Sequence, residues 1–170
     1  FIYFAYYAFF AVIPLYFFCR KKKQETFAIF SLTTFTYLCN YLFFFLMPVL
    51  GPRAVPLIQE LQVRRHSGFF FTEINRILQA IGGVSGAAFP SSHVAGALAW
   101  FLAAWRYSKK LGYLTAPIAF TIGISTVYMN LHHEVDFISG YLWGAIGFFI
   151  ALKLIKKRGE DPRAILQKPA

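Results

Sequence analysis

Long apolar runs separated by short basic or polar segments dominate the chain. Runs of about 17–25 apolar residues are long enough to cross the hydrocarbon core of a bilayer as helices. The chain opens on Phe1 without the pattern of a signal peptide, which leaves room for a further, sixth span before it. The predicted fold is an all-α, polytopic transmembrane helical bundle with five visible spans, near residues 1–19, 27–50, 91–108, 112–131 and 134–155.

The 51–90 connection between the second and third spans is too long to be structureless in a compact protein. An amphipathic helix lying on the membrane surface is predicted over 72–82, with helically spaced isoleucines at 74, 77 and 81. A weaker helical pattern begins at Pro56. We expect a single transmembrane domain over 1–158, followed by a polar cytoplasmic tail, 159–170, that frays.

Composition agrees with this assignment. The 170 residues are 58% hydrophobic and 20% aromatic, well above the roughly 45–50% apolar content of an ordinary soluble domain. The 17 Lys and Arg residues outnumber 7 Asp and Glu. Because the basic residues punctuate apolar spans rather than polar sequence, this charge argues against a nucleic-acid partner and for the lipid bilayer.

The basic residues also predict an orientation. They cluster after the first, third and fifth spans, at 20–23, 106–110 and 153–158. Cytoplasmic loops are enriched in Lys and Arg, so these three ends are predicted to face the cytoplasm. The 51–90 connection and the 131–134 turn then share the opposite side, and all four histidines of the chain lie there.

Ionisable side chains at the edge of the spans indicate a functional site, because such groups are costly to keep near lipid. His132 and Asp136 are four residues apart. On a helix this spacing places both on one face, where the carboxylate can orient the imidazole and leave its other nitrogen as a nucleophile. His133 is also within helical reach of Asp136, so spacing alone does not choose between the histidines.

A second group of polar residues opens the third span. Ser91 and Ser92 precede a helix whose free N–H groups and dipole suit a phosphate. His93 at its rim is a candidate proton donor to a leaving oxygen. The rigid turn that ends in Arg53 delivers a guanidinium to the same side, and guanidinium groups bind phosphate bidentately.

The order of these motifs resembles the type 2 phosphatidic acid phosphatase superfamily, over about residues 46–140. The resemblance rests on an Arg-containing element, Pro-Ser-x-His at 90–93, and Ser-x(6)-His-x(3)-Asp at 125–136. It implies a helical enzyme that hydrolyses phosphoesters without a metal or other cofactor. The implied roles are nucleophile for His132, orienting carboxylate for Asp136, general acid for His93, and phosphate binding for Arg53, Ser91 and Ser92.

The chain also departs from the family pattern. Leu46 stands where the first motif has Lys, Ala54 where it has Pro, Ser92 where the second has Gly, and Thr126 where the third has Arg. Two expected phosphate-binding cations are therefore absent. The candidates to replace them are arginines of the long connection, namely Arg64, Arg65 and Arg76.

The function implied is hydrolysis of a lipid phosphate through a phosphohistidine, at the periplasmic face of a bacterial inner membrane. Phosphatidylglycerophosphate, undecaprenyl diphosphate, phosphatidate and lipid A 1-phosphate all fit; the compact size resembles bacterial members of the superfamily, and lipid A 1-phosphate is slightly preferred. One alternative is a phosphotransferase of the same superfamily. Another is a non-catalytic protein that binds lipid, or haem between His93 and His132. A metal bound by His132, His133 and Asp136 is disfavoured, since adjacent helical side chains point about 100° apart.

Overall fold

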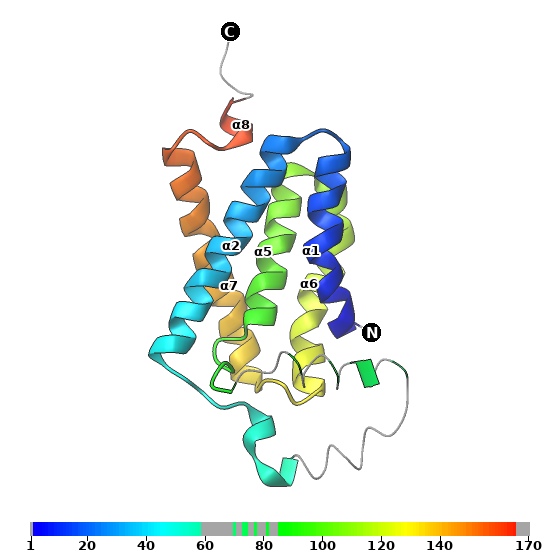
Figure 1. The fold of residues 1–170 in the computed structure, drawn as a ribbon, viewed down its shortest axis with the longest axis vertical. Helices are drawn as coiled ribbons and strands as arrows, with labels where there is room; N and C mark the ends of the chain where they lie inside the picture. The colour runs from blue at the N-terminus through cyan, green and yellow to red at the C-terminus, as the bar shows by residue number, and fades with distance from the viewer. Residues whose placement is uncertain are drawn as a thin grey trace.

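The computed structural model describes residues 2–58, 70, 73–74, 77, 81 and 85–165. Apart from an isolated pairing of Val49 with Ala87, regular structure in these residues is helical. The long helices run side by side as a bundle (Figure 1). They are α1 (Ile2–Cys19), α2 (Lys23–Leu46), α5 (Ser92–Tyr107), α6 (Lys109–Tyr128) and α7 (Glu134–Lys157). The prediction of an all-α membrane bundle is confirmed.

Four of these helices, α1, α2, α6 and α7, are long and apolar enough to cross a membrane. The helix α5, predicted as a span, has only 16 residues. It is the central helix, because it packs against the other four and buries most of its side chains, many of them alanine. Its neighbours, rather than lipid, surround it.

Two predicted spans are displaced by a few residues along the chain. The helix α2 ends at Leu46 rather than at residue 50, because residues just before a proline, here Pro48, disfavour helical backbone. The helix α6 ends at Tyr128 rather than at 131, and Asn130 just beyond it adopts a left-handed conformation with φ of 53°. Both helices also begin earlier than predicted, at Lys23 and at Lys109, and the Lys109 ammonium group lies 4.2 Å from the centroid of the Trp105 ring.

The bundle has two ends that differ in the segments they carry (Figure 1). The turn between α1 and α2, the junction of α5 with α6 and the end of α7 lie at one end, which carries the three basic clusters and is called the basic end below. The segments 47–58, 86–91 and 129–133 lie at the opposite end, which is called the site end. The grouping of the three basic clusters is as predicted.

The close approach of α5 and α7 depends on small residues. A Cβ atom built on Gly144 of α7 would lie 2.7 Å from the Cα of Ala95 in α5. One built on Gly140, a turn nearer the site end, would lie 2.8 Å from the carbonyl oxygen of Ser91. Small residues let helix backbones approach in this way within membranes. The first turns of α5 and α7 are consequently held against each other.

The connection from 51 to 90 is described only in part. A short 3-10 helix, η1 (Pro52–Ala54), follows α2, and residues 56–58 begin a helical turn. Within the helix predicted over 72–82, residues 73, 74, 77 and 81 are helical, and the others lie outside the described residues. Ile77 and Ile81 are exposed.

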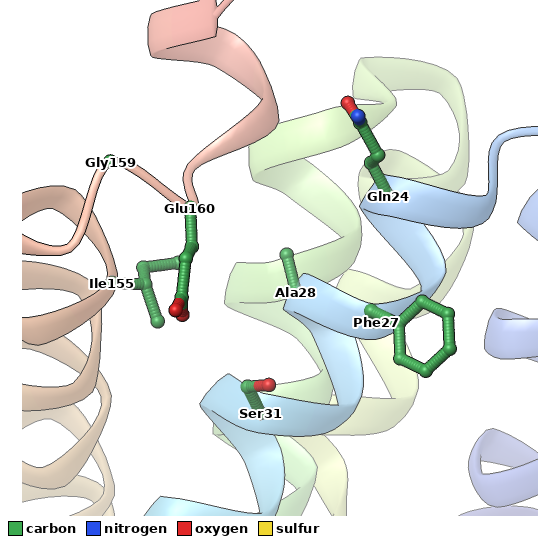
Figure 2. A pocket seen from close by; sticks show the side chains of 7 residues that line it. All are labelled: Gln24, Phe27, Ala28, Ser31, Ile155, Gly159 and Glu160. Carbon is green, nitrogen blue, oxygen red and sulfur yellow. The ribbon is translucent and has the colours of Figure 1, made fainter.

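At the basic end, the segment after α7 packs against α5. We expected this tail to fray, but Asp161 is fully buried and forms an ion pair with Arg106 of α5. The short helix α8 (Pro162–Ile165) follows, and residues 166–170 lie outside the described part. A cavity of about 490 Å³ opens between α2 and α7 at this end, with the Glu160 side chain hanging between the two helices (Figure 2).

Candidate active site

Three inter-helix segments meet at the site end. The amide of Val49 donates to the carbonyl of Gly86 at 3.1 Å, and the amide of Ala88 donates to the carbonyl of Val49 at 3.1 Å. Gly51 packs so closely on the third segment that a Cβ atom there would lie 2.9 Å from the Leu131 carbonyl oxygen. These backbone contacts fix the segment after α6 relative to the segment before α5.

His132 lies in the turn between α6 and α7, and its side chain is 5% exposed. Its Nδ1 atom lies 2.8 Å from the carbonyl oxygen of Ala88. A carbonyl oxygen can only accept a hydrogen bond, so Nδ1 carries the proton and donates it. The neutral ring then presents Nε2 with a lone pair, which is the form required of a nucleophile.

Asp136 lies in the first turn of α7 with its Oδ2 atom 3.7 Å from Nδ1 of His132. We expected the two residues to share one helical face, but His132 precedes the helix. Asp136 is instead the third residue of α7, where its Oδ2 atom accepts a hydrogen bond of 2.7 Å from the amide of His133. The Ala88 carbonyl therefore fixes the His132 tautomer, and Asp136 supplies a nearby negative charge.

The structure also distinguishes the two adjacent histidines. His133 is the N-cap residue of α7 and its side chain is exposed. The His132 side chain is buried and its ring lies 3.7 Å from the Asp136 carboxylate, whereas His133 contacts that carboxylate through its backbone amide.

His93 lies in the first turn of α5, close to His132. The centroids of the two rings are 5.7 Å apart and the rings meet edge to face. The Nε2 atom of His93 lies 3.0 Å from the hydroxyl of Tyr3 in α1. Its Nδ1 atom is buried and has no hydrogen-bond partner among the described residues.

The segment that leads into α5 is held by backbone and amide contacts. The amide of Ser91 donates to the carbonyl of Asp136 at 2.9 Å, and the side-chain amide of Asn40 donates to the carbonyl of Pro90 at 3.2 Å. Ser91 is the N-cap residue but makes no side-chain cap bond, and its buried hydroxyl finds no partner in the described parts of the chain. Ser92 is the first residue of α5 and is half-buried.

Arg53 approaches from η1, and its Nη2 atom donates to the carbonyl of Met129 at 3.0 Å. Burial lowers the pKa of Arg53, and the nearby Tyr3 opposes this shift. Leu46 is 67% exposed, and the Thr126 hydroxyl bonds to the Gly123 carbonyl of its own helix. Positions 46 and 126 thus add no charge to the site.

Arg64, Arg65 and Arg76, the predicted substitutes for the missing cations, lie outside the described residues. Among the Lys and Arg residues that the structure does describe, Arg53 is the one at the site end.

Sequence reasoning did not find three contributors to the site. Ala88 acts through its backbone, which leaves no signal in residue type. Asn40 is an uncharged polar residue within an apolar span, and that alone could have marked it as a helix-to-helix contact. From the sequence alone, Tyr3 cannot be distinguished from an aromatic membrane anchor. Only the tertiary structure shows its hydroxyl beside His93.

A profile of the PAP2 superfamily matches residues 1–150. The match covers most of the chain and includes every site residue named above, so the protein belongs to this superfamily. No curated protein and no solved structure matches the chain significantly. Membership in the superfamily, together with the membrane-spanning helices, supports phosphatase-type activity in a membrane protein.

Proposed function

We propose that the protein is a metal-independent lipid phosphatase that works through a phosphohistidine intermediate. The observation that carries the proposal is the setting of His132. Its Nδ1 atom is anchored on the Ala88 carbonyl at 2.8 Å, which leaves Nε2 for attack, and the ring lies beside His93. An anchored imidazole with a second imidazole at contact distance suits a nucleophile and a general acid.

In the first step, Nε2 of His132 attacks the phosphorus atom of the lipid phosphate. The bond from phosphorus to the leaving oxygen breaks, and that oxygen takes a proton from His93. The phosphorylated ring carries a positive charge, which Asp136 stabilises from 3.7 Å away. The products of this step are a lipid alcohol and a phosphohistidine.

In the second step, water attacks the same phosphorus atom and gives a proton to His93. The phosphorus–nitrogen bond breaks, inorganic phosphate leaves, and both histidines return to their starting forms. Arg53, Ser91 and Ser92 bind the non-bridging oxygens in both steps. Catalysis of this kind depends on positioning and on groups that match the developing charge.

The membrane setting supports a lipid substrate with its phosphate at the interface. The basic end lies opposite the site end (Figure 1), and on the positive-inside rule we propose that the site faces the periplasm of a bacterial inner membrane. Phe70, Ile77 and Ile81, in the connection between α2 and α5, are exposed apolar side chains that suit contact with acyl chains. Among lipid phosphates, lipid A 1-phosphate is the substrate that we propose.

The test is a panel of lipid phosphates incubated with the purified full chain. We expect release of inorganic phosphate from at least one lipid, unchanged by EDTA. Loss of activity in EDTA would disprove metal independence. Transfer of phosphate to a second lipid, with no free phosphate, would replace hydrolysis by phosphotransfer.

The intermediate is tested by quenching the reaction with a radiolabelled substrate and measuring protein-bound phosphate that is stable to base. The His132→Ala variant should lose both the label and the turnover. His133→Ala is the matched control, because its side chain is exposed, and should keep both. Normal turnover by His132→Ala would end the proposal.

A further inference from the structure

The helix α1 reaches the site end through a buried tyrosine. Tyr3 is 3% exposed, and its hydroxyl lies 3.0 Å from Nε2 of His93. The two ring centroids are 5.2 Å apart. None of the family motifs seen in the sequence includes Tyr3, and the mechanism above does not use it.

The two nitrogens of His93 have unequal surroundings. Nε2 is hydrogen-bonded to Tyr3, whereas Nδ1 is buried without a partner among the residues that the structure describes. A buried N–H group without an acceptor is rarer in proteins than a buried acceptor without a donor. The neutral ring therefore carries its proton on Nε2 and donates it to the Tyr3 oxygen.

A general acid needs a proton on the nitrogen that faces the leaving oxygen. When His93 is doubly protonated, Nε2–H remains bonded to Tyr3 and the second proton sits on Nδ1. Among the described contacts, this Nδ1 proton is the one that no protein acceptor holds, which leaves it for transfer to a substrate oxygen. His132 and His93 are thus anchored by opposite nitrogens, the first through Nδ1 to Ala88 and the second through Nε2 to Tyr3.

The tyrosine is itself well fixed. The ring of Tyr6 packs against His93 from α1 as well, with centroids 5.2 Å apart, and the Tyr6 hydroxyl lies 2.6 Å from that of Tyr37 in α2. The Tyr3 hydroxyl also lies 3.3 Å from that of Tyr7. These contacts hold α1 against α2 and α5, so the Tyr3 hydroxyl has little freedom to leave His93.

We propose that Tyr3 is a positioning residue, whose hydroxyl holds the His93 ring so that Nδ1 faces the leaving oxygen. The inference rests on the proposed function, because it assumes that His93 is the general acid. It adds α1, which carries none of the motifs, to the parts of the chain that control leaving-group departure.

The test compares a lipid phosphate with p-nitrophenyl phosphate in wild-type protein and in Tyr3→Phe. A lipid alkoxide is a poor leaving group and needs a proton, whereas p-nitrophenolate leaves without one. We expect Tyr3→Phe to lower lipid phosphate turnover by about 10- to 100-fold, which is part of what general acid catalysis contributes. Turnover of p-nitrophenyl phosphate should stay within about threefold, since nucleophilic attack by His132 is intact.

Tyr7→Phe is the matched control. It removes the other hydroxyl contact of Tyr3 but keeps the bond to His93, so both substrates should react as in wild type. Equal loss on both substrates in Tyr3→Phe, or no loss on either, would overturn the role of Tyr3. Wild-type protein inactive on every lipid phosphate and on p-nitrophenyl phosphate would instead overturn the proposed function.

A second measurement needs no variant. In wild-type protein labelled with ¹⁵N-histidine, the nitrogen chemical shifts report which ring nitrogen is protonated. We expect neutral His93 to carry its proton on Nε2 and neutral His132 on Nδ1. A His93 ring protonated on Nδ1 would contradict the inference even if Tyr3→Phe failed to fold.

Discussion

Two aspartates are buried at opposite ends of the bundle, and their surroundings differ. Asp161 at the basic end is 0% exposed, and its carboxylate contacts the guanidinium of Arg106, the hydroxyl of Tyr107 and the amide of Arg163. Asp136 at the site end is 2% exposed. Its carboxylate accepts the amide of His133 and lies 3.7 Å from the ring of His132.

The difference separates a structural carboxylate from one suited to catalysis. A guanidinium stays charged at every pH that proteins experience. The negative charge of Asp161 therefore has a permanent positive partner in Arg106. An imidazole becomes a full cation only when it is protonated or phosphorylated. Asp136 therefore gains its counter-charge during the proposed reaction, and its charge stabilises the intermediate more than the resting protein.

After the complete loss of turnover expected for His132→Ala, the next largest effect at the site end is expected from His93→Ala. Loss of the general acid should lower turnover of the lipid phosphate by about 100- to 10,000-fold. Turnover is compared per folded molecule, because the removed ring also packs against Tyr3 and Tyr6 and is hydrogen-bonded to Tyr3, so the midpoint of thermal unfolding in detergent should fall as well. A variant with near-normal phosphate release would exclude His93 as the proton donor.

Asp136→Asn tests the charge directly. Asparagine can still accept from the His133 amide, and the Ala88 carbonyl still fixes the His132 tautomer. Only the negative charge is lost, so we expect turnover to fall by about 100- to 1,000-fold, the range seen when one electrostatic contact of a transition state is removed. If initial phosphate release were unaffected, the contrast between the two aspartates would be unfounded.

Asp161→Asn should have the opposite profile. Removing one partner of a buried ion pair costs about 3–5 kcal/mol, and the 18% exposure of the Arg106 side chain places the loss nearer 3 kcal/mol. Thermal unfolding should show a clear decrease, while turnover per folded molecule stays unchanged. Glu160→Gln, at the exposed neighbouring residue, serves as the control and should alter neither quantity.

Gly51→Ala is expected to have the smallest effect. The new methyl group would lie 2.9 Å from the Leu131 carbonyl oxygen, so the segment that carries His132 must shift. Misplacement of a nucleophile by a fraction of an ångström should lower turnover about tenfold. Gly159→Ala is a useful comparison at the basic end: that glycine has a φ of 69° with open space around it, so any cost should appear in stability rather than in turnover.

Sequence reasoning predicted the helical bundle because each membrane span is a long run of apolar residues, which can be identified without knowing what the helix packs against. It also predicted the alternation of basic and histidine-bearing ends. It was least accurate at the helix ends, where Pro48 and Asn130 terminate α2 and α6 earlier than hydropathy indicates. Hydropathy marks the lipid-facing length, whereas backbone conformation decides where a helix stops.

For the site, spacing predicted the proximity of His132 and Asp136, but for an incorrect reason. They are close because a turn precedes α7 and the Asp136 carboxylate accepts the amide of His133 in that turn, and not because both lie on one helical face. The roles drawn from the family resemblance for Arg53, Ser91 and Ser92 stay predictions.

The sequence by itself determined the membrane-spanning character, the family and the residue types available for chemistry. Only the tertiary structure decided which atom anchors each histidine, because Ala88 acts through a carbonyl group and Tyr3 comes from a helix some ninety residues away from His93 in the chain. Contacts of this kind arise from packing between distant segments, and no local pattern of residues encodes them.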